Sequence, residues 1–150
     1  MCGILGFSGQ PNEGQWGETH RLLQALFMAS EHRGHHATGF VARTEPFKGR
    51  STGEIVIDKS PHTASKFVAR NGSWRNLARR RCSSVVGHVR WATHGSPRDN
   101  ANNHPFRGEN SLFLVHNGVL SDYGEVCERN GLTLDTECDS EAILRVVESS

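Results

Sequence analysis

The second residue of the chain is a cysteine, and its position suits nucleophilic catalysis. Removal of Met1 would leave Cys2 with a free α-amine close to its own thiol. An α-amine titrates at about 7.7–8.0 and a free thiol at about 8.5, so the neutral amine can accept the thiol proton near neutral pH. Gly3 lets another group approach the backbone closely. The alternative is that Cys2 is an ordinary packed side chain, and this residue alone does not decide between the two.

A second group of chemically capable residues follows the apolar stretch at 84–91. Arg90 can hold a carboxylate through two parallel hydrogen bonds, and Trp91 beside it can cover a small ligand. Thr93 and His94 come next, in a Gly/Pro turn of the kind that commonly carries function. The alternative is a structural salt bridge at Arg90 with Trp91 in the core.

The dipeptide Asn117-Gly118 has two interpretations. The Asn amide and the following Gly N–H can point at one oxygen, as a developing oxyanion requires. The same dipeptide is the strongest short signal for a type I′ hairpin turn. From the residues alone, the turn is the favoured interpretation.

Two further clusters favour structural roles. One contains four histidines but no definite carboxylate partner, so we expect no metal site; its members are His32, His35, His36 and His104. The other is basic, with Arg75 and the run at 79–81. The net charge of the whole chain is only +1, so we expect a solvated face and no nucleic-acid partner.

Composition bounds the elements that must position these residues. The chain has 150 residues, 35% of them hydrophobic, which suits one domain with a real core. No apolar stretch approaches the roughly 18 residues of a membrane span, and the start lacks a basic signal region. We therefore expect a cytoplasmic protein without membrane contact. Its four cysteines show no zinc spacing, and no disulfide framework is expected.

Periodicity and turn residues predict a mixed α+β chain. Strands are predicted at 4–8, 37–42, 54–58, 84–91 and 111–116, with the second and third forming a hairpin whose loop contains Pro46 and Gly49. Helices are predicted at 18–30, 64–70 and 122–129, and from 139 to the end.

Three local signals refine these helices. An apolar face is predicted for the first helix, made of Leu22, Leu23, Leu26 and Phe27. Asn71-Gly72 is predicted to break the chain after the second helix, and Asn130-Gly131 to stop the third.

Six segments, in one order along nearly the whole chain, resemble the glutaminase domain of class-II glutamine amidotransferases, which are N-terminal-nucleophile hydrolases. The stretch 90–95 is most similar to that of the glucosamine-phosphate synthases. The segments are Cys2-Gly3-Ile4, Arg33-Gly34, His88-Val89-Arg90-Trp91-Ala92-Thr93-His94-Gly95, Asn103-His104-Pro105, His116-Asn117-Gly118 and Cys138-Asp139-Ser140-Glu141.

The resemblance implies hydrolysis of the glutamine side-chain amide through a thioester on Cys2, with its α-amine as general base. Asn117 and the Gly118 amide would form the oxyanion hole. Arg90 would hold the substrate carboxylate and Asp139 the ammonium group. The implied fold is an αββα sandwich of two antiparallel sheets between helix layers.

The resemblance also implies roles around the substrate. Trp91, Thr93 and His94 match a mobile loop that closes over glutamine, and His104 matches a histidine near that loop. Arg33 and Gly34 match a segment beside the nucleophile. No cofactor or metal is implied. The ammonia would pass to a synthase domain or a separate partner protein.

The chain departs from the family pattern in three ways. The relatives place an aspartate two positions after Arg33-Gly34, where this chain has His36. The loop from Arg90 to His104 is one residue longer. The chain stops at Ser150 inside a helix, so residues 1–150 are expected to form an incomplete glutaminase domain without an acceptor domain.

Two other functions stay open at this stage. The first is a non-catalytic module for glutamine sensing or assembly. The second is an N-terminal-nucleophile amidohydrolase acting on another amide, which predicts that Arg90 and Asp139 do not converge on one site.

Overall fold

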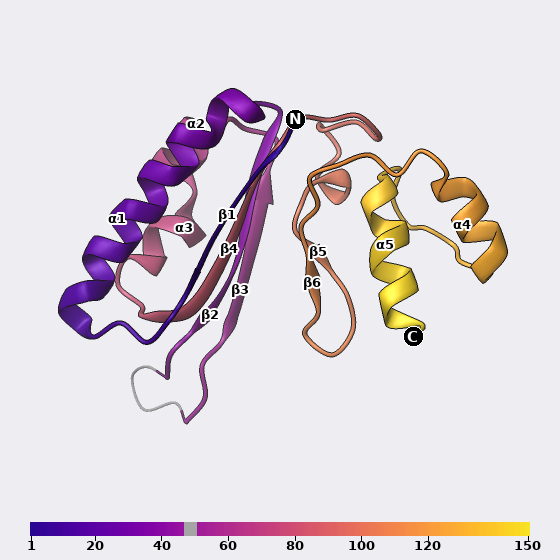
Figure 1. Ribbon diagram of the computed structural model, residues 1–150. Coiled ribbons are helices and arrows are strands. Elements are labelled where there is room, and N and C mark those ends of the chain that lie inside the picture. The colour runs from indigo at the N-terminus through magenta and orange to yellow at the C-terminus, as the bar shows by residue number, and fades with distance from the viewer. Residues whose placement is uncertain (47–50) are drawn as a thin grey trace.

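A four-stranded antiparallel sheet runs through the centre of the molecule in the computed structural model, which describes residues 1–46 and 51–150 (Figure 1). Its strands lie in the order β1 (Gly3–Ser8), β4 (Cys82–Arg90), β2 (Ala37–Thr44) and β3 (Ile55–Ser60). The four strands expected in this part of the chain are confirmed, and so is the hairpin between β2 and β3. Gly49 of its loop lies outside the described residues.

Side chains alternate across this sheet, because successive residues of a strand point to opposite faces. On β4, Val85 and Val89 are almost completely buried, and on β2 Phe40 is fully buried on the same side. His88, between them in the alternation, faces the opposite layer, which holds the chemically capable side chains. The sheet therefore separates a hydrophobic core from the candidate site.

Helix α1 (Glu13–Ser30) begins five residues before the predicted start at Glu18. Asn12 and Gln15 form a capping box: Gln15 N–H donates to Asn12 Oδ1 at 2.9 Å, and Asn12 N–H donates to Gln15 Oε1 at 3.1 Å. Part of the predicted apolar face is wrong. Leu23 and Phe27 are buried, but Leu22 is 61% exposed and Leu26 39%, because the buried stripe continues through the earlier turns of the longer helix.

The hydrophobic core lies between the sheet and the helices α1, α2 (Ala64–Arg70) and α3 (Gly72–Leu77) (Figure 1). Trp74 is its centre and meets the rings of Phe27 at 4.9 Å and Phe40 at 5.3 Å, edge-on. The predicted break is confirmed at Asn71, which ends α2 in an extended conformation and also caps α3, where its Oδ1 accepts from Trp74 N–H at 2.8 Å.

A second layer covers the other face of the sheet (Figure 1). It holds a hairpin of β5 (Phe106–Arg107) and β6 (Phe113–Leu114), the final helix α5 (Asp139–Glu148) and α4 (Tyr123–Asn130). The strand predicted at 111–116 is reduced to two paired residues. Asn110 and Ser111 have positive φ, as the centre of a tight hairpin turn requires, so they belong to the turn. The predicted stop of α4 is confirmed at Gly131, which has a left-handed φ of 61°.

The described residues thus form an α+β structure, with one four-stranded and one two-stranded antiparallel sheet between helices. In the same part of the chain, no helix combines the length and hydrophobicity needed to cross a bilayer.

We expect Asn12→Ala to lower the free energy of unfolding by about 1 kcal/mol, because the Gln15 N–H in the first turn of α1 loses its acceptor, Asn12 Oδ1. Urea unfolding followed by circular dichroism measures this change. Gln10→Ala, at an exposed position two residues earlier, is the matched control and should change stability by less than about 0.5 kcal/mol. Equal effects of the two substitutions would contradict the capping role.

Candidate active site

Cys2 lies where the first strand meets the end of β4. Strand β1 pairs with β4 in the register Gly3↔Val89, which brings Cys2 beside Arg90 and Trp91. The Trp91 N–H donates to Cys2 Sγ at 3.3 Å. Cys2 is 8% exposed, whereas Met1 before it is 79% exposed. The thiol is therefore held at the end of the sheet, with the preceding residue in solvent.

Asn117 meets Cys2 from the second layer. The Cys2 N–H donates to Asn117 Oδ1 at 3.1 Å, across 115 residues of sequence. The hairpin-turn interpretation of Asn117-Gly118 is wrong, since a type I′ turn needs positive φ at both residues and, in the described chain, the positive φ values fall at Gly95, Asn110, Ser111 and Gly131.

Arg33 and Gly34 lie beside the segment that contains Cys2. Arg33 Nε donates to the Cys2 carbonyl at 3.2 Å. A Cβ on Gly34 would lie 2.6 Å from the Arg90 carbonyl carbon, so only glycine permits this close approach of two backbones. Both residues thus position the start of β1 against the end of β4.

The Arg90 guanidinium is 2% exposed and donates to protein acceptors. Its Nη1 donates to Asn103 Oδ1 at 2.9 Å, and its Nη2 donates to the carbonyls of His94 and Gly95, the latter at 3.2 Å. Arg90 therefore folds the loop that follows β4 around its own side chain.

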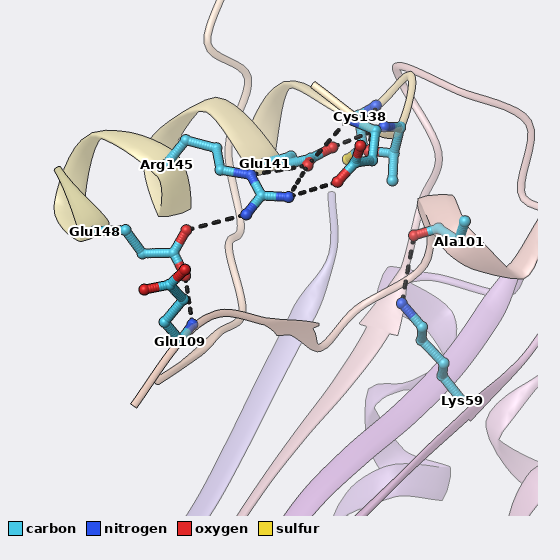
Figure 2. Close-up of polar contacts among 9 residues, drawn as sticks. Lys59, Ala101, Glu109, Cys138, Glu141, Arg145 and Glu148 are labelled. Carbon is cyan, nitrogen blue, oxygen red and sulfur yellow. Dashed lines mark hydrogen bonds and ion pairs between the residues drawn. The ribbon is translucent and has the colours of Figure 1, made fainter. Parts of the chain in front are cut away.

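Lys59 and Asn103 fix the same loop from its other end. Lys59 Nζ donates to the Asn103 carbonyl at 2.5 Å. It also donates to the Ala101 carbonyl at 3.3 Å (Figure 2). Burial lowers the pKa of Lys59. Asn103, fully buried, also donates to the Pro97 carbonyl at 2.9 Å. Sequence reasoning assigned no role to either residue; the run of asparagines in a long polar loop was the available signal.

Asp139 begins α5 with a buried carboxylate. Asp139 is 2% exposed, and its Oδ2 accepts from Leu120 N–H at 2.7 Å. His94 Nδ1 lies 3.6 Å from the same oxygen, and the His94 ring meets Tyr123 edge-on at 5.5 Å. Asp139 thus joins the loop after β4 to the segment after Gly118.

A network of ion pairs on α5 stabilises the turn that precedes this helix (Figure 2). Glu141 accepts from the backbone of Asp135 at 3.1 Å and Thr136 at 2.7 Å, and Arg145 pairs with both Glu141 and Glu148. Burial raises the pKa of Glu141, but these hydrogen bonds outweigh it and lower the pKa overall. The carboxylate is therefore charged and anchors the turn before the helix.

The rings of His88 and His104 pack on each other beneath the site. His104 is 4% exposed and lies 4.1 Å from the His88 ring, centre to centre, and His88 Nε2 contacts the His116 carbonyl at 3.0 Å. Burial lowers the pKa of His88 to about 4 and the pKa of His104 well below its ordinary value. Both rings are neutral at neutral pH and serve as packing.

The structure brings most of the expected residues into two neighbouring groups. In the first group, Arg33, Trp91 and Asn117 each contact Cys2, and Gly34 lies against the end of β4. Arg90, His94 and Asp139 form the second group. Arg90 and Asp139 share the neighbour Cys138, whose Sγ lies 4.0 Å from Arg90 Nη2 and 3.6 Å from Asp139 Oδ1.

Four residues of the expected site have surroundings that differ from one another. Gly118 packs against the His116 ring, where a Cβ would lie 2.6 Å from Nε2. His104 lies deeper than a loop residue, against the sheet. Thr93 is exposed. Trp91 is 42% exposed and packs on His35 at 4.9 Å and His36 at 5.2 Å.

Curated relatives align with this chain over 99% of its length. Isomerizing glutamine–fructose-6-phosphate aminotransferases are 34% identical over 152 residues in Aeropyrum pernix, 32% over 155 in Staphylococcus aureus and 29% over 151 in Bacillus licheniformis. The chain spans 22% of the length of each. No protein-family model matches it.

The chain belongs to the class-II glutamine amidotransferases. Within that family, the relatives it matches are glutamine–fructose-6-phosphate aminotransferases, enzymes that carry a glutamine amidotransferase domain.

The buried His88 predicts acid sensitivity of the fold. Its pKa is about 4 when folded and 6.5 when exposed, so the unfolded chain binds the proton first and stability falls as the pH drops from 6.5 towards 4. His88→Gln keeps a donor for the His116 carbonyl but does not titrate. Between pH 7.5 and pH 5, we expect wild type to lose about 2 kcal/mol more than this variant in urea unfolding. Parallel pH profiles would contradict the assignment.

Proposed function

We propose that this chain is a glutaminase module that hydrolyses the side-chain amide of glutamine through a thioester on Cys2. The carrying observation is the convergence on Cys2: the Trp91 N–H on its sulfur and the Asn117 amide on its nitrogen. These two contacts join three segments of the chain, which contain Cys2, Trp91 and Asn117. The arrangement holds the sulfur and the nitrogen of one residue in fixed positions, as a nucleophile carrying its own base requires.

The nucleophilic step begins after removal of Met1, whose exposure leaves it open to an aminopeptidase. The free amine takes the Cys2 thiol proton, and the thiolate attacks the amide carbon of glutamine. The tetrahedral intermediate collapses by breaking its C–N bond, and the α-ammonium returns the proton to the departing ammonia. Water then hydrolyses the thioester to glutamate and regenerates the thiol.

Asn117 serves two groups in this proposal. Its Oδ1 holds the Cys2 nitrogen, while its Nδ2 can donate to the oxyanion of the tetrahedral intermediate. The Gly118 N–H would be the second donor. Because the segment is no hairpin turn, its amides are free of the bonding that such a turn would impose.

The two ends of a zwitterionic amino acid need opposite charges. Arg90 would bind the α-carboxylate and Asp139 the α-ammonium group. Since Arg90 now donates to the carbonyls of His94 and Gly95, carboxylate binding would exchange those contacts and move the loop that carries Trp91, Thr93 and His94. Substrate binding would therefore be coupled to loop closure.

The layers support the wider proposal. The order helices, sheet, hairpin, helix in Figure 1 fits an αββα sandwich. We include in the proposal that residues 1–150 belong to such a domain and that its ammonia passes to a synthase domain or partner protein. The relatives are themselves named for amino transfer from glutamine to fructose 6-phosphate.

The test of the proposal is glutamate and ammonia release from glutamine by the Met1-processed chain. We expect Cys2→Ala to reduce the rate by about 10³-fold or more with an unchanged circular dichroism spectrum. Cys127→Ala, on α4, is the matched control and should retain activity. Activity persisting in Cys2→Ala would exclude the thioester mechanism.

Asp139→Asn should raise KM for glutamine about 10- to 100-fold, because a charge-assisted hydrogen bond to the substrate ammonium is lost. The asparagine Oδ1 can still accept from Leu120 N–H, so the fold is preserved. Asp135→Asn removes an exposed carboxylate from the same segment and serves as control. An unchanged KM in Asp139→Asn would contradict ammonium binding there.

A non-catalytic assembly module is the second candidate. It is favoured by Arg90, which is buried and donates its hydrogen bonds to Asn103 and to the His94 carbonyl of the chain itself. Mass spectrometry of the cellular protein discriminates the two, since intact Met1 would block the amine. The third function considered, hydrolysis of an unrelated amide, is less well supported because Arg90 and Asp139 share the neighbours His94 and Cys138.

A further inference from the structure

His36 contacts the main chain next to the nucleophile, although nothing in the family pattern assigns it a role. Its backbone N–H donates to the Arg90 carbonyl at 3.0 Å, and its Nδ1 accepts from the Ala92 N–H at 2.9 Å. These two bonds bracket Trp91, whose own N–H donates to Cys2 Sγ. The Arg90 carbonyl and the Trp91 N–H belong to one peptide group, so His36 fixes the peptide group that contacts the sulfur and the one that follows it.

The contact with Ala92 requires one protonation state. A ring nitrogen that accepts a hydrogen bond carries no proton, so His36 is neutral with its proton on Nε2. Protonation would place a hydrogen on Nδ1, facing the Ala92 N–H, and would replace attraction with repulsion. A carboxylate, such as the aspartate of the family pattern, would remain an acceptor down to about pH 4.

The surroundings of the ring favour the neutral form. The His35 ring packs at 4.6 Å and the Trp91 ring at 5.2 Å, and the Arg90 guanidinium lies at the end of the adjoining strand. Burial first, and then the charges of His35 and Arg90, lower the pKa of His36 from 6.5. The acceptor is thus present at neutral pH and is lost only as the pH falls below the ordinary range of a histidine.

We propose that His36 is a positioning residue: its neutral imidazole holds the main chain at 90–92 against Cys2, and protonation releases this segment and slows glutamine hydrolysis. The inference deepens the proposed function and rests on it. The chemistry itself stays with Cys2. His36 acts through the Trp91 N–H and the geometry of the sulfur.

Two substitutions separate the acceptor from the titration. In His36→Asn, the Oδ1 occupies the place of Nδ1 and accepts without titrating. In His36→Gln, the amide lies near the place of Nε2, too far along the side chain to accept from Ala92 N–H. His35→Gln, at the exposed neighbour, controls for loss of a nearby charge. The measurement is kcat and KM for glutamine from pH 5 to pH 8 with the Met1-processed chain.

At pH 8 we expect His36→Asn and His35→Gln to match wild type, and His36→Gln to lose about tenfold in kcat with KM little changed. In acid, every form loses activity as the Cys2 amine is protonated, tenfold per pH unit. Wild type has a second proton-dependent loss, so at pH 5 His36→Asn should be more active than wild type, by at most the roughly tenfold that loss of the acceptor costs in His36→Gln. A merely structural contact would lower thermal stability without changing this slope.

Failure of the inference is distinguishable from failure of the function. Equal acid profiles for wild type and His36→Asn, or full activity of His36→Gln, would overturn the role of His36 while leaving glutaminase activity established. Inactive wild type would overturn the proposed function instead. In that case ¹⁵N NMR of the His36 ring still tests the contact: an Nε2–H tautomer whose titration moves the Ala92 amide supports it, and the opposite tautomer overturns it.

Discussion

The antiparallel pairing of β1 with β4 is the constraint on which the candidate site depends. Its register, Gly3↔Val89, sets which residues of β4 lie beside Cys2. A shift by one residue would turn every side chain of β1 to the opposite face. Leu5 would leave the core, and the sulfur would lose the Trp91 N–H. Burial of Leu5 and Val89 under α1 and precise placement of the thiol are therefore consequences of the same pairing.

A buried polar framework carries this precision into the loops. Arg90, Asn103 and Lys59 satisfy backbone carbonyls that would otherwise be unpaired, so the long segment between β4 and β5 is ordered without regular strands or long helices. On the other side, Glu141 and Asp139 accept backbone N–H groups of the segments they face. Charged side chains at both ends of the site thus also hold the backbone of the loops around it.

The sequence predicted the strands of the main sheet because their apolar runs are long and bounded by turn residues. It predicted α1 only in part, because its first turns carry few apolar residues and the capping box at Asn12 was not recognised. The sequence alone could not show whether Asn117-Gly118 forms a hairpin turn. The turn between β5 and β6 is formed instead by Asn110 and Ser111, a pair without the glycine that usually marks such a turn. The contacts of Asn103 and His36 depend on tertiary placement, which no spacing encodes. The resemblance pointed to the right family, and the comparisons confirmed it.

The pairing of β1 with β4 also orders events during synthesis. In the four-stranded sheet, β4 is the neighbour of β1, and its matching residues follow some 80 positions later in the chain. At about 5–20 residues per second, a ribosome needs roughly 4–17 s to cover that distance. During this interval the first strand is exposed and unpaired, and Met1 and Cys2 are open to the enzymes that trim nascent chains. The start of the chain therefore stays accessible until the pairing that later buries Cys2 has formed.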